Sequence, residues 1–281
     1  MKIMLANVAI SEKDGEFAKN ILCPRWKENF DLVKRPDTEI ISRFSEWGIV
    51  GMEGFFYHVI DTLNAQAVFQ ACKTAENDGF DAIIITCFGD PMLDQIRSFV
   101  NIPVVSIGEA SLRTAAMMGK KIGLVTISES NIMEAYHTFE KYGLKEYCAG
   151  IVATTEKPEE QPEALINAKN AIASFKEVSK KLIENGAEIL IPGCGLMSPA
   201  LRLAPGCRDE YPDGCTEVHG VPVLDVLSVA VKVAEMMVDL KNAGSTWISR
   251  SGFYKMPPQS ALESGKMVLE DNRQTFWDLK L

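Results

Sequence analysis

The chain lacks the features that mark several large classes of protein. Basic residues are few and dispersed, since 29 Lys and Arg stand against 38 Asp and Glu, a formal net charge of −9 at pH 7. Nucleic-acid-binding proteins normally carry a basic stripe that displaces counterions, so we expect no nucleic-acid partner. No apolar run reaches the roughly 18 residues of a membrane-spanning helix, so we expect no membrane partner. The composition, 47% hydrophobic and 24% charged, is that of a globular protein.

The start of the chain and its cysteines indicate a cytoplasmic protein. Residues 1–10 form a short apolar run without a small-residue cleavage site, which predicts a first β-strand and not a signal peptide. The 7 cysteines are odd in number and scattered along the chain. This usage is typical of a reducing compartment and not of a disulfide framework. Each thiol is therefore expected to be a core residue, a nucleophile or a ligand.

Short runs rich in Ile and Val alternate with longer helical segments. This alternation predicts an α/β fold in which parallel sheets are flanked by helices. Apolar residues three and four positions apart predict helices over 63–77, 166–185 and 230–240. The predicted strands are Lys2–Ala9, Ala82–Thr86, Val104–Ile107, Ile122–Thr126, Ile189–Ile191 and Val223–Val226.

Two segments of the chain, 79–87 and 186–194, follow the same pattern. In each, a helix ends at a glycine, an acidic residue follows, and an apolar strand leads to a cysteine at the same offset. Farther along, Ile102–Ile107 matches Val221–Val226, after a longer, turn-rich connection over 204–219 in the second half. The chain therefore consists of two related halves, with an insertion in the second that is a candidate lid over a cleft.

The last predicted helix and the tail fold back most simply on the first half. We therefore expect a discontinuous first domain, 1–112 plus 225–281, that carries Cys87. The second domain, 113–224, carries Cys194 and the 204–219 insertion. The tail from Gly244 is polar and contains proline, and it packs across either a domain or a subunit interface. We expect a homo-oligomer.

Cys87 and Cys194 are predicted at the carboxyl ends of two parallel strands. Ligands of α/β proteins bind at that edge, where helix N-termini and backbone N–H groups point into a crevice. Such donors are expected to lower the pKa of a thiol. One sulfur on each side of a cleft suits a cofactor-free stereoinversion, in which one thiolate removes a proton and the opposite thiol returns one. A cysteine after an apolar strand is more often a small buried hydrophobe, so the residues alone leave both interpretations open.

The surroundings of both cysteines resemble hydantoin and allantoin racemases of the aspartate/glutamate racemase superfamily. Thr86–Asp94 is similar to the C-F-[GD]-D-P-G-L segment of that group, and Gly186–Met197 to its G-A-E-x-[IV]-[VI]-L-G-C-A-G-M segment. Further similar segments cover most of the chain: Val50–Gly54, Ile102–Ala110, Ile122–Ile127 and Ser249–Pro258. The resemblance implies two pseudo-symmetric flavodoxin-like domains with the active site in the cleft between them.

The resemblance also implies the roles of individual residues. Cys87 and Cys194 would be the two acid/base thiols of a racemase that needs neither pyridoxal phosphate nor another cofactor. The substrate would be a small molecule of the hydantoin or allantoin type. The residues implied to surround it are Asn7, Phe88, Gly89, Asp90, Thr126, Ser128, Gly193 and Gly195.

Several alternatives remain open on the sequence. Within the superfamily they are an amino-acid racemase for Asp or Glu and a maleate-type cis/trans isomerase. The presence of both cysteines argues against a malonate-type decarboxylase, which resembles a one-thiol system. Outside the superfamily the alternatives are a non-catalytic small-molecule binding protein and a dithiol redox sensor. A zinc site built from Cys194, Cys207, Cys215 and His219 lacks a tight C-x-x-C pair, so we expect no metal.

Overall fold

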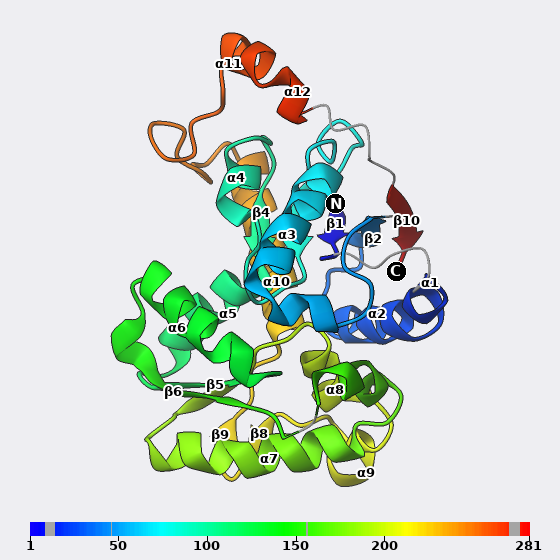
Figure 1. The fold of residues 1–281 in the computed structure, drawn as a ribbon, viewed down its shortest axis with the longest axis vertical. Coiled ribbons are helices and arrows are strands. Elements are labelled where there is room, and N and C mark those ends of the chain that lie inside the picture. Colours follow the sequence, from blue (N-terminus) through cyan, green and yellow to red (C-terminus); the bar gives the residue numbers. More distant parts are fainter. Residues whose placement is uncertain (9–14, 46, 156, 270–275) are drawn as a thin grey trace.

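Two α/β units lie at opposite ends of the long axis of the molecule (Figure 1). This computed structural model describes residues 1–8, 15–45, 47–155, 157–269 and 276–281. The described residues form a five-stranded sheet, a three-stranded sheet and a small two-stranded hairpin. The predicted α/β fold with parallel sheets flanked by helices is confirmed.

The larger sheet has the strand order β10-β2-β1-β3-β4. Its neighbouring strands are parallel, except that β10 runs antiparallel to β2. Successive residues of β1 point into two different cores, Ile3 and Leu5 into one and Met4 and Ala6 into the other. Both faces are therefore buried, as the continuous apolar strands predict. The strands are β1 (Lys2–Ala6), β2 (Glu39–Ser45), β3 (Ala82–Ile85), β4 (Val104–Ser106) and β10 (Phe276–Lys280).

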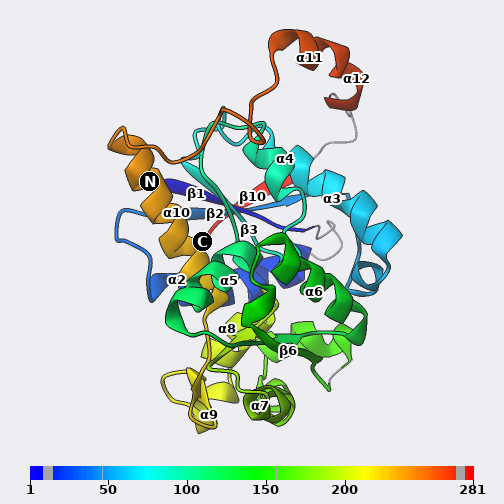
Figure 2. The ribbon, with the colours of Figure 1, turned by 90° about the vertical axis from the view of Figure 1, so that its left-hand side faces the viewer.

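Helices cover both faces of this sheet. On one face, α10 packs against α2, α5, β3 and β4. On the other face, α3 packs against β1, β2 and α4. Figure 2 shows α10 and α3 on opposite sides of the strands. The bounds are α1 (Gly15–Phe17), the π-helical turn η2 (Ala18–Leu22), α2 (Cys23–Asp31), the 3-10 turn η3 (Glu53–Phe56), α3 (His58–Cys72), α4 (Leu93–Arg97), α5 (Ile107–Met118) and α10 (Val226–Asn242).

The smaller sheet has the strand order β6-β5-β7, and all its strands are parallel. Helix α7 packs against β5 and β6, and α8 packs against α2 and α10 of the other unit. The strands are β5 (Ile122–Thr126), β6 (Cys148–Ala153), β7 (Ile189–Pro192), β8 (Glu217–Val218) and β9 (Val221–Pro222). The helices and 3-10 turns are η4 (Glu129–Asn131), α6 (Ile132–Lys141), η5 (Lys145–Tyr147), η6 (Pro158–Leu165), α7 (Lys169–Glu184), α8 (Met197–Leu203) and α9 (Cys207–Glu210).

The two glycines of the sequence repeat close the same helix-ending turn. Gly79 and Gly186 have φ of 78° and 87°, which glycine adopts without steric cost. In each case the glycine N–H donates three residues back, and the next residue donates five residues back: Gly79 to Glu76, Phe80 to Ala75, Gly186 to Ile183 and Ala187 to Leu182. This is the Schellman arrangement, and it starts β3 and β7 at equivalent points.

The predicted strands and helices differ from the structure mainly at their ends. The helix predicted over 63–77 begins earlier, as α3 begins at His58, and the one over 230–240 is longer at both ends. The predicted strand Val223–Val226 is wrong, because it shrinks to a single parallel bridge between Val223 and Leu190. Asp225 ends the extended chain there by accepting hydrogen bonds from the Leu227 and Ser228 N–H groups at the start of α10. Ala9, the predicted end of the first strand, lies outside the described residues.

The chain after α10 returns to the larger sheet. Part of the segment 245–258 lies against α4, where the Arg250 guanidinium donates to the Arg97 carbonyl oxygen (2.6 Å) and the Tyr254 hydroxyl to the Asp94 carboxylate (3.0 Å). Helices α11 (Gln259–Ser264) and α12 (Lys266–Leu269) then extend away from the body (Figures 1 and 2). Strand β10 then pairs with β2.

The domain boundaries at 112 and 225 stay a prediction. Within the described part of the chain, no helix is both long and apolar enough to cross a membrane.

Candidate active site

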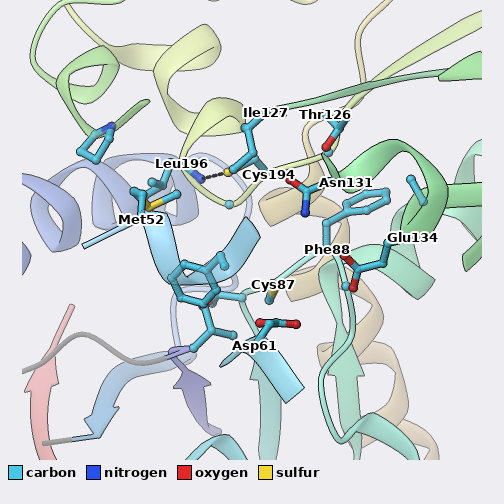
Figure 3. A pocket seen from close by; sticks show the side chains of 18 of the residues that line it. Met52, Asp61, Cys87, Phe88, Thr126, Ile127, Asn131, Glu134, Cys194 and Leu196 are labelled. Carbon is cyan, nitrogen blue, oxygen red and sulfur yellow. Dashed lines mark hydrogen bonds between the residues drawn. The ribbon is translucent and has the colours of Figure 1, made fainter. Parts of the chain in front are cut away.

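One cavity of about 320 Å³ lies between the two units and receives both repeat cysteines. Figure 3 shows Cys194 and Cys87 on opposite sides of this pocket. Its volume is near the lower end of the roughly 300–1,000 Å³ of small-molecule sites. The described lining residues are Val8, Phe17, Leu22, Trp26, Gly51, Met52, Phe55, Asp61, Thr86, Cys87, Phe88, Gly89, Leu124, Thr126, Ile127, Asn131, Glu134, Ala135, Thr138, Pro162, Gly193, Cys194, Gly195 and Leu196.

Cys87 follows strand β3 directly, and a buried carboxylate fixes its loop. Asp90 accepts hydrogen bonds from the backbone N–H groups of Gly108 (3.1 Å) and Glu109 (3.4 Å), at the start of α5. It also accepts the Ser106 and Tyr142 hydroxyl protons. The Ser106 hydroxyl contacts the Cys87 carbonyl oxygen at 3.1 Å. The loop that carries the first thiol is therefore held to α5 and to the end of α6.

Cys194 follows strand β7, and its loop approaches the end of β3 closely. A methyl group on Gly195 would lie 2.6 Å from the Thr86 carbonyl oxygen, so no side chain fits there. The Trp26 indole N–H donates to the Gly195 carbonyl oxygen at 3.0 Å. The Cys194 loop can lie against the end of β3 because Gly195 has no side chain, and the Trp26 contact holds it there. The two cysteine loops therefore meet at one pocket.

Both thiols are partly buried, and the expected fall in their pKa is wrong. Burial raises the pKa of Cys87 well above its ordinary value, and the negative charge of Asp61 raises it further. Burial also raises the pKa of Cys194. The expected N–H donors are present, at Gly89 for Cys87 and at Leu196 and Met197 for Cys194, and they act in the predicted direction. Desolvation outweighs these donors because it penalises the charged thiolate.

Polar groups gather on one part of the pocket wall. Asp61 from α3 and Glu134 from α6 are carboxylates on the Cys87 side (Figure 3). Burial raises the pKa of Asp61 to about 6, with a further rise from Glu134. The Asn131 side-chain oxygen is buried and has no hydrogen-bond partner among the described residues. The described lining contains no Lys, Arg or His side chain.

The structure brings most, but not all, of the expected substrate-binding residues to the pocket. Those in the described lining are Phe88, Gly89, Thr126, Gly193 and Gly195. Asn7, Asp90 and Ser128 are not among the described lining residues. The Asn7 side chain donates to the Ser42 hydroxyl (2.7 Å) and the Arg43 carbonyl oxygen (3.0 Å). The Ser128 hydroxyl caps η4 by accepting the Ser130 N–H at 3.2 Å.

The 204–219 insertion does not act as a lid in this structure. None of its residues lines the pocket, and its helix α9 packs on α8. Cys207 and Cys215 are buried there, and the Cys207 thiol donates to the Leu201 carbonyl oxygen at 2.7 Å. In the described part of the chain, no three His, Cys, Asp or Glu side chains are arranged to hold a metal ion.

The residues that sequence reasoning missed come from segments without a strong pattern. Asp61 lies before the predicted start of its helix, and Glu134 lies on a helix that was not predicted. Asn131 lies three residues after Ser128. The sequence therefore predicted the correct loop, but it is Asn131 and not Ser128 that lines the pocket. Trp26 lies on α2, and the signal that could have located this helix is the proline at position 24, in its first turn.

Comparison with known proteins agrees with this geometry. Residues 37–234 match the sequence model of the Asp/Glu/hydantoin racemase family. The chain belongs to this family. Hydantoin racemase from Pseudomonas sp. (strain NS671) is 29% identical over 210 residues, which cover 73% of this chain and 76% of that protein. Hydantoin racemase from Rhizobium meliloti is 24% identical over 184 residues, 63% of this chain and 68% of that protein.

Solved structures of the family share the fold. Allantoin racemase from Pseudomonas fluorescens superposes with a TM-score of 0.72 at 26% identity, and the match covers 92% of this chain and 98% of that one. Glutamate racemase from Campylobacter jejuni gives a TM-score of 0.53 at 15% identity over 96% of this chain and 99% of that one, which shows the fold alone. The chain is therefore an isomerase, a racemase of the Asp/Glu/hydantoin family.

Proposed function

We propose that this racemase inverts a carbon next to a carbonyl group in a neutral cyclic ureide of the hydantoin or allantoin type, with Cys87 and Cys194 as its acid/base pair. The observation that carries the proposal is the placement of two equivalent strand-end thiols on opposite sides of one pocket whose described lining holds no basic side chain.

The chemistry needs one thiolate and one thiol. The thiolate removes the proton from the reacting carbon, and the electron pair of that C–H bond moves onto the neighbouring carbonyl oxygen. The opposite thiol then delivers its proton to the other face of the carbon, which inverts the centre and exchanges the roles of the two sulfurs. Burial raises the pKa of both thiols, which makes each thiolate a stronger base towards a weak carbon acid.

The polar wall supports a ureide more than an amino acid. Free aspartate or glutamate carries two carboxylates, and the described lining offers the carboxylates of Asp61 and Glu134 and no cationic side chain to offset the charge repulsion. A ureide ring is neutral and presents N–H donors. The unpaired oxygen of Asn131 and the carboxylates of Asp61 and Glu134 are acceptors for such donors.

The apolar wall supports a substituent on the reacting carbon. Leu22, Trp26, Met52, Phe55 and Leu196 provide a surface on which an alkyl or aryl group loses contact with water. Such burial contributes roughly 25 cal/mol per Å² of apolar area. Phe88, Gly89, Thr126, Gly193 and Gly195 form the wall between the two sulfurs in this proposal. Asn7 and Asp90 hold that wall from behind.

The test is a panel of single enantiomers followed by circular dichroism. It contains 5-substituted hydantoins, allantoin, aspartate and glutamate, each against its uncatalysed background, with protein free of metal and pyridoxal phosphate. We expect inversion of at least one ureide and none of the two amino acids. Inversion of aspartate or glutamate alone would overturn the ureide assignment and favour an amino-acid racemase.

We also propose that the protein works as a homo-oligomer in the reducing cytoplasm. All 7 cysteines are free, as the two-thiol chemistry requires. The N-terminal part of α3 exposes apolar side chains, with Val59 67% and Leu63 58% accessible to solvent. Val59 and Leu63 are four residues apart on one helix face, and exposed apolar side chains that gather in this way are typical of an interface.

A further inference from the structure

We infer that the two thiols are unequal before substrate binds: the carboxylates of Asp61 and Glu134 disfavour a thiolate at Cys87, so that Cys194 is the sulfur that ionises more readily in the free enzyme. This inference rests on the proposed two-thiol function, because it assigns the starting proton to one of the same two sulfurs.

Negative charge surrounds Cys87 from three elements. Asp61 comes from α3, Glu134 from α6, and Asp90 from the loop that follows Cys87 itself. A methyl group built on Gly89 would lie 3.0 Å from the Glu134 Oε1 and 3.8 Å from the Cys87 Sγ. The carboxylate and the sulfur are thus separated by no more than the sum of these distances. A second negative charge at the sulfur is unfavourable at such a separation.

The charge of Asp61 is not cancelled by a close partner. Its carboxylate makes no hydrogen bond or ion pair with another residue that the structure describes. Figure 3 shows it next to Cys87, on the side away from Cys194. His58, on the same helix, favours the ionised form of Asp61.

Cys194 has a different environment. The Leu196 N–H donates to its sulfur at 3.4 Å, and the Met197 N–H also favours the charged form. The groups that act on this sulfur include no carboxylate among the described residues. Both sulfurs are desolvated, and both accept backbone N–H groups, one at Cys87 and two at Cys194. The feature that distinguishes them is the group of carboxylates that acts on Cys87 alone.

The inequality has a defined consequence for the reaction. A free enzyme with a Cys194 thiolate accepts directly the enantiomer whose C–H bond faces Cys194. That turnover leaves a proton on Cys194 and a thiolate on Cys87. Because two enantiomers have equal free energy in water, kcat/KM must be the same in both directions. The asymmetry therefore appears in the reactivity of the free enzyme and not as a preferred direction of racemisation.

Alkylation without substrate tests this directly. Iodoacetamide is uncharged and reacts with thiolates, so peptide mass spectrometry after timed quenching gives a rate for each sulfur. At pH 8 we expect Cys194 to react about tenfold or more faster than Cys87, since one pKa unit is a tenfold change in thiolate. The variants Asp61→Asn and Glu134→Gln remove charge at nearly constant size. Each is expected to raise the Cys87 rate about threefold to tenfold and to leave the Cys194 rate unchanged.

Matched controls and pH separate charge from access. Asp209→Asn lies on the exposed insertion, and Glu140→Gln lies on α6 away from the pocket, so neither is expected to change either rate. Burial raises the pKa of Asp61 to about 6 and that of Asp90 to about 6, and both carboxylates are therefore neutralised as the pH falls below that value. The Cys194 rate divided by the Cys87 rate should fall towards 1 between pH 8 and pH 5.5 in the wild type. The fall should be smaller in Asp61→Asn.

Two results would overturn the inference. One is a Cys87 that reacts as fast as Cys194 in the wild type, and the other is a rate ratio that neither charge-removing variant changes. Circular dichroism of each variant confirms that it is folded. The enantiomer panel tests the proposed function separately, because the alkylation order is measured without turnover.

Discussion

Gly195 shows how one missing side chain assembles the site. The backbone there passes so close to the Thr86 carbonyl oxygen that the two cysteine loops share one pocket. The sequence places Gly195 beside the second thiol, but it does not indicate that the Thr86 carbonyl oxygen occupies the space that a side chain would need. That reason lies in a contact between residues far apart in the chain.

Replacing Gly195 with alanine is therefore expected to impair the reaction more than the fold. The added methyl group meets the Thr86 carbonyl oxygen at 2.6 Å, so the Cys194 loop must shift. A displacement of about 1 Å in such a site costs about a hundredfold in rate, and overpacking costs about 1–3 kcal/mol of stability. Initial rates of inversion and urea unfolding measure the two effects.

The matched control is Gly252→Ala. That glycine is exposed, and a methyl group there meets nothing within 4 Å. It should leave both the rate and the unfolding free energy unchanged. An active Gly195→Ala enzyme with wild-type rates would show that the close approach of the loops does not position Cys194.

Helix α10 depends on a residue that was first assigned to a strand. Asp225 accepts the Leu227 and Ser228 N–H groups at 3.2 and 3.1 Å, and its carboxylate also accepts from the Asn29 amide and the Ser198 hydroxyl. It therefore caps α10 and joins that helix to α2 and α8. The apolar pattern of 223–226 matches the strand at 104–107, so the repeat predicts a strand where the Asp225 side chain instead caps a helix.

Replacing Asp225 with alanine should destabilise the protein by about 1–3 kcal/mol. Loss of an N-cap alone costs about 1 kcal/mol, and the remaining cost comes from the buried donors left without an acceptor. Thermal unfolding followed by circular dichroism measures the change. Ser128→Ala, which removes the single exposed cap of η4, should cost less than about 0.5 kcal/mol. Equal effects of the two variants would contradict the linking role of Asp225.

The strands that were missed explain where pattern reading fails. Strand β2 contains Arg43, a charged residue that does not suit a buried strand on its own. Its guanidinium is paired with Asp78 at 2.8 Å and with Asp278 of β10 at 2.8 Å, and both partners are distant in sequence. Strand β6 is only half-buried and carries two small residues, Ala149 and Gly150, which weakens its signal. The central strands were predictable because apolar residues dominate them.

Taken as a whole, the molecule has two halves of one pattern that meet at a pocket. The repeat predicted both thiols and the edge at which they lie, because parallel strands fix which end carries the loops. The carboxylates of the pocket were not predictable, since α3 and α6 reach it only through the packing of the two units. The rise in the pKa of both thiols was not predictable either, because their burial depends on the assembled pocket.

The exposed apolar surface of α3 leads to a prediction about assembly. Sedimentation equilibrium is expected to give a multiple of the 31.0 kDa chain mass. Leu63→Lys should shift the protein towards the single chain, because burying an unpaired ammonium group at an interface is unfavourable. Met117→Lys, at a side chain of α5 that is 82% exposed, is the control and should not change the mass. A wild-type mass of one chain would contradict the proposed oligomer.

The central claim is that both thiols move the proton, and deuterium exchange tests it most directly. Single enantiomers of the ureide that the panel identifies are incubated in D₂O with the wild type, Cys87→Ser and Cys194→Ser. Proton NMR follows loss of the C–H signal, and circular dichroism follows inversion. We expect every inversion in the wild type to be accompanied by deuterium incorporation, and each serine variant to lose at least about a hundredfold in inversion rate. Inversion that persists in either variant, or inversion without deuterium incorporation, would contradict the two-thiol account.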